Sequence, residues 1–385
     1  FFLAAIDDRV KAAAPVSGAL STPGWVEKQL SAAHCDCQWP VNSHGLLYSE
    51  IGALAAPRAF LFCNALSDQG FPMDSFNEMI DKIRRVYDLY GAGDNLRTAT
   101  VPGGHADTES IRLPVYSFFL KEFLGIDTTF SREGVIDTVG REELVCFRDG
   151  YPLDEIMSRI HERFIPAAGF KAEVLSDGQR KSRLADLVSR LRAQVFCSFP
   201  QQAVEFETAW GDETKMWNRS IRKVSFNSFE DLRVNAVYSV PAETLPAPAG
   251  PAVLVVDERR GIRAWGNDFR PEGYRWGNRA VLIAETVDQG SRAVDEDLRN
   301  LRNDDPIHHI KREAMVTGTT FDAMRVYETM RAVSFLRAQP GYGDRGIYIY
   351  GRGTMGVNAL YAALLDDNVD RVILESPPAS HLSGP

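Results

Sequence analysis

Residues 345–367 read RGIYIYGRGTMGVNALYAALLDD, and this stretch decides the fold class that the sequence predicts. Its first part is rich in β-branched and aromatic residues, which is typical of a buried strand, and its last part is an apolar helix. A glycine-rich turn joins the two. Strands of this kind, each followed by a helix, recur along the chain. They predict the α/β class, with a mostly parallel sheet covered by helices.

The turn itself has the form of a catalytic elbow that lacks its catalyst. In serine hydrolases of the α/β class this turn reads G-x-S-x-G, with the nucleophile on a strained strand-to-helix corner. Here Gly351 matches the first glycine, Gly353 replaces the serine, and Met355 replaces the last glycine. Thr354 is one position away, and no base is evident near it. We therefore predict a degenerate elbow formed by Gly351, Gly353, Thr354 and Gly356.

The same residues also match G-x-G-x-x-G, the phosphate-binding turn of dinucleotide sites. Such a site follows the first strand of a βαβ unit and has an acidic residue about 20 positions later. Glu375 stands at about that distance, but it ends a strand that belongs to the repeat described next. We favour a decayed hydrolase domain over a nucleotide site and predict no cofactor.

Residues 1–17 repeat residues 360–376 at an offset of 359. The segments read FFLAAIDDRVKAAAPVS and LYAALLDDNVDRVILES, and both look like a helix, a short turn and a strand. The identical pairs are Ala4/Ala363, Asp7/Asp366, Asp8/Asp367, Val10/Val369 and Ser17/Ser376. The counterpart of Gly353 would lie at position −6. We therefore expect a fragment that begins after the nucleophile of one hydrolase domain and stops within a second.

Three regions follow from the pattern. Residues 1–125 are predicted to be the C-terminal part of a first α/β-hydrolase domain, 126–203 a helical connector, and 204–385 the N-terminal part of a second, degenerate copy. The connector is expected to contain helices near 153–164 and 181–196, and the polar, β-branched stretch at 215–240 is expected to form antiparallel strands. The sequence leaves open whether the two incomplete copies pack as one permuted unit.

Two side chains stand where a catalytic acid and base are expected. Asp68 follows the buried strand in PRAFLFCNAL, and His105 follows the next strand on a Gly-Gly turn. Catalytic groups gather at the C-terminal ends of parallel strands, and α/β-hydrolases have the order Ser, Asp or Glu, His along the chain. Asp74 is the local competitor, but Asp74 or Ser75 is expected to be the N-cap of the helix that ends near Gly91 or Gly93.

The five cysteines give little support to a metal site. His34, Cys35, Asp36 and Cys37 are adjacent in HCDC, whereas structural zinc sites use C-x2–4-C pairs with a second pair elsewhere. We expect a packed loop near an active site here and no metal.

The charge balance limits the partners. The formal net charge of −9 argues against binding to the phosphate backbone of nucleic acids, and no apolar run is long enough to span a bilayer. The sequence does not indicate an oligomeric state.

Taken together, these segments resemble tandem α/β-hydrolase proteins of bacteria that are acetyl xylan esterase-like and related to prolyl oligopeptidase-type hydrolases. The resemblance covers residues 1–125 well and 204–385 more weakly. It lies in LAAIDDRVKAAAPVSG, HCDCQWPVNSH, ALAAPRAFLFCNALSDQGFP, KIRRVYDLYGA and GGHADTESIRLPVYSFF, and further along in FDAMRVYETMRAVSFL, YGRGTMGV and ESPPASHLSGP.

The resemblance implies that Asp68 is a triad acid and His105 a triad base, with the serine preceding Phe1. It also implies an acetylated plant polysaccharide as substrate, a non-catalytic second copy, and an extracytoplasmic location. Two alternatives remain open: a non-catalytic carbohydrate-binding or scaffold protein made of degenerate hydrolase domains, and a peptidase of the same fold.

Overall fold

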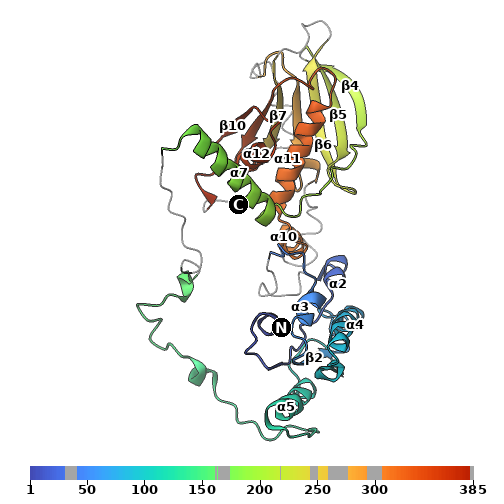
Figure 1. Ribbon diagram of the computed structural model, residues 1–385, viewed down its shortest axis with the longest axis vertical. Coiled ribbons are helices and arrows are strands. Elements are labelled where there is room, and N and C mark those ends of the chain that lie inside the picture. The colour runs from blue at the N-terminus through green and yellow to red at the C-terminus, as the bar shows by residue number, and fades with distance from the viewer. Residues whose placement is uncertain are drawn as a thin grey trace. The chain divides into compact units, whose positions relative to one another are not determined.

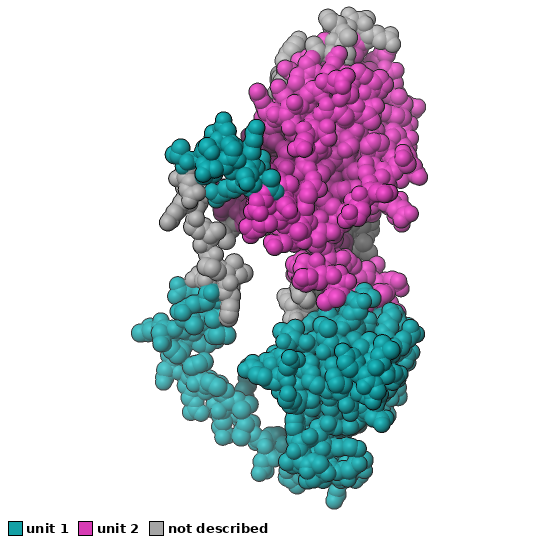
Figure 2. Space-filling model, viewed as in Figure 1, with its two compact units in different colours: residues 1–21, 47–185 teal, residues 22–46, 186–385 magenta. Residues whose placement is uncertain are grey.

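The computed structural model describes residues 1–30, 41–160, 163, 174–216, 218–242, 250–258, 276–292 and 306–381. The chain divides into two compact units, which Figure 2 shows in different colours. Unit 1 comprises residues 1–21 and 47–185, and unit 2 comprises residues 22–46 and 186–385. The described strands form two separate sheets, one in each unit, so the two repeat copies do not contribute strands to a common sheet.

The sheet of unit 1 is parallel, with the order β1 (Ala12–Ala13), β2 (Ala59–Ala65), β3 (Leu96–Val101). Every residue of β2 is buried, as expected for the apolar run AFLFCNA in a central strand. Helix α4 (Met73–Leu89) connects β2 to β3, and α5 (Glu109–Leu124) follows β3 and contacts both strands. The predicted alternation of strands and helices is therefore present in this part of the chain.

One predicted helix boundary is wrong. The N-cap of α4 is Pro72 rather than Asp74 or Ser75. Proline is tolerated there because its nitrogen needs no partner at the end of a helix where amides are unpaired. Asp74 instead lies in the first turn, where a negative charge is favourable next to the helix N-terminus. Gly91 follows the helix with φ of 65°, in agreement with the predicted end.

The sheet of unit 2 is mixed. Its order is β10 (Arg371–Glu375), β9 (Ile347–Arg352), β7 (Ala252–Asp257), β8 (Val281–Glu285), β6 (Arg233–Pro241), β5 (Arg219–Asn227), β4 (Ala209–Met216). The first four strands pair in parallel and the last three are antiparallel, which confirms the predicted antiparallel stretch. Helices α11 (Phe321–Arg337) and α12 (Thr354–Leu365) pack on β7 and β9 (Figure 1). The fold is therefore α/β.

The remaining helices lie outside the strand–helix units described so far. They are α1 (Phe2–Ile6), α2 (Thr22–Glu27), α3 (Tyr48–Ala53), α7 (Asp177–Gln194) and α10 (Pro306–Val316), with 3-10 turns at Gly93–Asn95, Arg141–Leu144, Met157–Arg159 and Gly290–Arg292. Within the described ranges, no helix combines the length and apolar character needed to cross a membrane.

The connector differs from the prediction at one of its two helices. Helix α7 covers most of the predicted span 181–196, but the described residues 153–160 form only the 3-10 turn Met157–Arg159. Leu153 and Met157 are exposed, so this segment has no apolar surface against which an amphipathic helix could pack. The rest of the predicted span, apart from residue 163, lies outside the described residues.

The repeat is visible in the backbone. Helices α1 and α12 end at the matched positions Ile6 and Leu365, and the next residues have closely similar angles, φ −126° and ψ 109° at Asp7 against φ −129° and ψ 108° at Asp366. Each of these aspartates accepts a bond of 2.9 Å from the amide two residues later. Ser17 and Ser376, which also match, have φ of 47° and 50°. Equal conformations at equal positions support a duplication.

Candidate active site

The parallel pairing of β2 and β3 brings Asp68 and His105 together. The two strands pair in register up to Ala65 and Val101, and the pairing continues past them, because the Ser67 amide donates to the Gly103 carbonyl at 2.9 Å. The residues that follow both strands therefore emerge at one edge of the sheet. Asp68 and His105 are 37 residues apart in sequence, and their side chains meet at this edge.

The imidazole of His105 is hydrogen-bonded to the carboxylate of Asp68. The distance between Nδ1 of His105 and Oδ2 of Asp68 is 2.9 Å. The Asp68 side chain is fully buried, whereas the His105 side chain is 65% exposed. A carboxylate can only accept, so Nδ1 carries the proton and Nε2 is left to accept one. This is the tautomer that a general base acting on a hydroxyl requires.

Several groups keep Asp68 ionised despite its burial. Burial alone would raise the pKa of this carboxyl, but hydrogen bonds from His105 and Ser17, the charge of a protonated His105 and the Gly70 amide lower it by more. The net effect is a pKa below the usual 3.8. The amides of Gly70 and Phe71 donate to Oδ1 at 2.9 and 3.2 Å, which leaves Oδ2 to face the imidazole. The sequence SDQGFP thus forms a turn in which the side chain of Asp68 accepts hydrogen bonds from the amides that follow it.

His105 rests on an aromatic surface. Its ring lies nearly parallel to that of Phe71, with centroids 5.9 Å apart and an angle of 12° between the planes. Phe71 is 2% exposed, so it is a fixed part of the core. The turn before His105 contains Gly103 with φ of 114°, a conformation that residues with a side chain rarely adopt.

The sequence did not reveal three of the residues around this pair. Ser17 donates to Asp68, and Phe71 stacks on His105. The side-chain amide of Asn64 donates to the carbonyl of Phe71, in the loop that follows Asp68. Only Ser17 carried a signal, since it is one of the identical positions of the repeat. The carboxylate of Asp74, the competing acid, accepts from the Ser75 amide at 2.8 Å through Oδ1.

The turn between β9 and α12 in unit 2, which the sequence predicts to be a degenerate elbow, has an unusual backbone conformation at Gly353. Gly353 has φ of 61° and ψ of −139°, a region that is nearly restricted to glycine. Gly351 and Gly356 allow β9 and α12 to approach closely, because a Cβ on Gly351 would lie 2.7 Å from the Cα of Gly356. Close packing and backbone angle therefore account for all three glycines of GRGTMG.

A carboxylate occupies the place where a side chain would stand. A Cβ built on Gly353 would overlap with Oε2 of Glu258, and that same oxygen accepts from the Thr354 amide at 2.9 Å. Glu258 thus caps the N-terminus of α12, where a negative charge is favourable. A nucleotide phosphate would meet this negative charge at the same amide. Glu375, the acidic residue in the alternative nucleotide motif, bonds Arg352 and Tyr350.

The predicted HCDC loop, residues 34–37, lies outside the described residues. Among those that are described, no group of three or more histidine, cysteine, aspartate or glutamate side chains could hold a metal ion.

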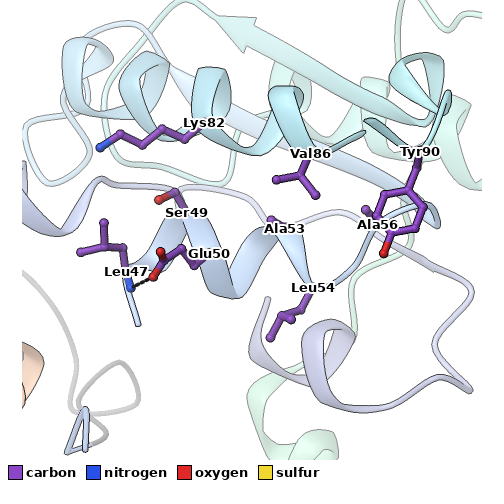
Figure 3. Close-up of a pocket in the computed structure, with 9 residues that line it drawn as sticks. All are labelled: Leu47, Ser49, Glu50, Ala53, Leu54, Ala56, Lys82, Val86 and Tyr90. Atoms are coloured by element: carbon purple, nitrogen blue, oxygen red, sulfur yellow. Dashed lines mark hydrogen bonds between the residues drawn. The ribbon is translucent and has the colours of Figure 1, made fainter. Parts of the chain in front are cut away.

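Unit 1 also has a surface pocket of about 460 Å³ between α3 and α4 (Figure 3). It is lined by Leu47, Ser49, Glu50, Ala53, Leu54, Ala56, Lys82, Val86 and Tyr90. Lys82 and Tyr90 lie toward opposite ends in this view. The Oε2 atom of Glu50 accepts from the Leu47 amide and so caps α3. Neither Asp68 nor His105 belongs to this lining.

No protein-family model matches the chain, and no curated protein matches it. Among solved structures, a provisionally named acetyl xylan esterase from Bacteroides fragilis is 14% identical with a TM-score of 0.46, over 58% of this chain and 61% of that one. An acetyl xylan esterase from Paenibacillus is 18% identical with a TM-score of 0.32, over 53% and 60%. Acetyl xylan esterase 1 from Thermoanaerobacterium is 14% identical with a TM-score of 0.35, over 52% and 58%. At these identities and TM-scores, the function has to be argued from the site itself.

Proposed function

We propose that the chain carries the acid and the base of a serine ester hydrolase, with Asp68 as the acid and His105 as the base. The observation that supports this most directly is the bond of 2.9 Å between a fully buried carboxylate and an exposed imidazole at the ends of neighbouring parallel strands. The order of the two residues along the chain is that of α/β-hydrolases.

In the proposed reaction, a serine hydroxyl transfers its proton to Nε2 of His105 while its oxygen attacks the ester carbonyl carbon. Asp68 holds the Nδ1 proton and stabilises the imidazolium. His105 then gives the proton to the leaving alcohol oxygen, which breaks the ester bond and leaves an acyl-serine. A water molecule then attacks the acyl carbon while Nε2 of His105 takes one of its protons, and His105 gives that same proton to the serine oxygen as the bond between this oxygen and the acyl carbon breaks, which releases the acid.

We propose that the nucleophile lies at position −6, the counterpart of Gly353 in the first copy of the repeat. The matched backbone angles at Asp7 and Asp366 support this assignment, as does the positive φ of Gly353 at the turn between β9 and α12. For unit 2 we propose a non-catalytic role in packing or in shaping a cleft, since Glu258 fills its elbow.

The substrate class that we propose is an acetylated plant polysaccharide, and it rests on the sequence resemblance. A peptidase would use the same acid and base, and a carbohydrate-binding protein would need neither. These two alternatives are outcomes of the test that follows.

The test uses the protein extended by the residues encoded before Phe1. A fluorophosphonate probe is expected to label one serine near position −6, and acetate release from acetyl-xylan is expected to fall by about 10⁴ in Asp68→Asn and His105→Ala. His44→Ala, which changes an exposed histidine, is the control and should stay within roughly twofold. Failure to label any serine favours the binding protein, and cleavage of peptides but not acetyl-xylan favours the peptidase.

A further inference from the structure

A polar side chain interrupts the most apolar strand of unit 1. Asn64 is the only polar residue of β2, and its exposed fraction is 0%. Among the described residues its Oδ1 has no hydrogen-bond partner. Burying an amide that is only partly bonded costs about 1–3 kcal/mol. An apolar residue would pack in this strand without that cost, which suggests that Asn64 has a role beyond packing.

The bonded half of the amide reaches the loop that carries the acid. Nδ2 of Asn64 donates to the carbonyl of Phe71 at 2.8 Å and lies 3.4 Å from the sulfur of Met73. The amide of the same Phe71 donates to Oδ1 of Asp68 at 3.2 Å. The backbone of Phe71 is therefore held on both sides, by the strand through its oxygen and by the acid through its nitrogen.

The ring of Phe71 in turn supports His105. The hydrogen bond from Nδ1 to Asp68 fixes the direction of the imidazole but leaves the ring free to rotate about that bond. The stacked face of Phe71, 5.9 Å away and inclined by 12°, restricts this rotation. Because His105 is 65% exposed, few other groups restrain it.

We propose that Asn64 is a positioning residue that sets the ring plane of His105 by anchoring Phe71. This inference rests on the proposed function for its meaning in catalysis, but its geometry can be tested without any substrate. Asn64 acts through Phe71 and does not touch the reacting atoms. Its predicted effect is on the lifetime of the bond between His105 and Asp68.

The experiment follows the Nδ1 proton of His105 by NMR in the chain labelled with ¹⁵N-histidine. In Asn64→Leu this proton is expected to exchange with solvent roughly fivefold to tenfold faster, the change that loss of one hydrogen bond produces. The matched control is Asn358→Leu, which removes a side chain that is 3% exposed and bonded to Asp322 in unit 2. The control should lower the stability of unit 2 and leave the His105 proton unchanged.

A double-mutant cycle separates positioning from general stability. Phe71→Leu removes the stacked face while keeping the carbonyl, and it should also accelerate exchange; Phe71→Tyr keeps the face and should preserve the slow exchange. In Phe71→Leu, adding Asn64→Leu should have little further effect, because the two residues act in series. Equal exchange in wild type, Asn64→Leu and Phe71→Leu would overturn the proposal.

The two proposals fail in different ways. Absence of a labelled serine in the extended protein would end the ester hydrolase but leave the Asn64 effect on His105 intact. An unchanged His105 proton would end the role of Asn64 while serine labelling persisted. If Asn64→Leu does not fold, the comparison of Phe71→Leu with Phe71→Tyr still decides whether the stacked face orients His105. Equal exchange in these two variants would overturn the proposal.

Discussion

The Oε2 atom of Glu258 overlaps with the position that a Cβ on Gly353 would occupy. One carboxylate therefore occupies the place of a side chain at residue 353 and caps the helix that follows it. Under the proposal that this turn is a degenerate elbow, the carboxylate of Glu258 occupies the place where the nucleophile would stand. Replacing the glycine by the serine of a hydrolase should consequently not produce an active elbow.

We predict that Gly353→Ser lowers the free energy of unfolding by about 1–3 kcal/mol, because a side chain at φ of 61° is strained and displaces Glu258 from its capping position. The variant should show no labelling of residue 353 by a fluorophosphonate. Gly343→Ala, where a Cβ would meet nothing within 4 Å, is the control and should change stability by less than about 0.5 kcal/mol. A labelled Ser at position 353 would contradict this account.

The two matched serines of the repeat should contribute unequally to the free energy of unfolding. Ser17 donates to the buried carboxylate of Asp68, whereas Ser376 is exposed, although both have φ near 50°. We predict that Ser17→Ala destabilises unit 1 by about 1.5–3 kcal/mol, the range for a bond to a charged group, and that Ser376→Ala is nearly neutral. Urea unfolding of both variants measures this, and equal effects would mean that the Ser17 bond contributes nothing.

Glu133 should hold the segment that follows α5 against that helix, even at moderately acid pH. Hydrogen bonds from Arg112 lower the pKa of Glu133 from 4.5 to about 2, with a further bond from Tyr116. Because the folded pKa lies below the unfolded one, the stabilisation is complete above pH 4.5 and is lost as the pH falls toward 2.

Pepsin, which works at acid pH, provides the measurement. At pH 4 it should cleave Glu133→Gln faster than wild type within residues 126–160, and near pH 2 the two rates should converge. Glu142→Gln, at an exposed position, is the control and should follow wild type throughout. Equal cleavage of Glu133→Gln and wild type at pH 4 would rule out this stabilisation.

The cysteines should react unequally with iodoacetamide. Cys63 is 1% exposed, and burial raises the pKa of its thiol to about 12. Cys146 and Cys197 are exposed. At pH 8, with each site followed by mass spectrometry, we predict that Cys63 reacts at least about a hundredfold more slowly than Cys146 and Cys197, since the thiolate is the nucleophile. Comparable rates would show that β2 opens readily.

The sequence by itself determined the strands and helices where apolar periodicity was strong. The run AFLFCNA became a wholly buried strand, and RGIYIYG became β9 with a helix directly after it. The repeat also predicted positions that the structure gives equal backbone angles, Asp7 with Asp366 and Ser17 with Ser376. Such features are local, since they depend on neighbouring residues and on a period of two or 3.6.

Other features depended on tertiary contacts that no local pattern encodes. The helix predicted near 153–164 does not form in its described part, because Leu153 and Met157 have no surface to pack on. Likewise, the sequence contained Glu258 but could not show that its carboxylate reaches the Thr354 amide, 96 residues away.

In the candidate site, too, some features followed from the sequence and others only from the folded structure. Sequence order and strand ends indicated Asp68 and His105, because neighbouring parallel strands end at one edge of a sheet. The 2.9 Å bond between them, the stacked ring of Phe71 and the hold of Asn64 on its carbonyl came only from the folded structure. Distances of this kind are fixed when a register pairs Ala65 with Val101, and a register is a property of two strands packed together rather than of either one.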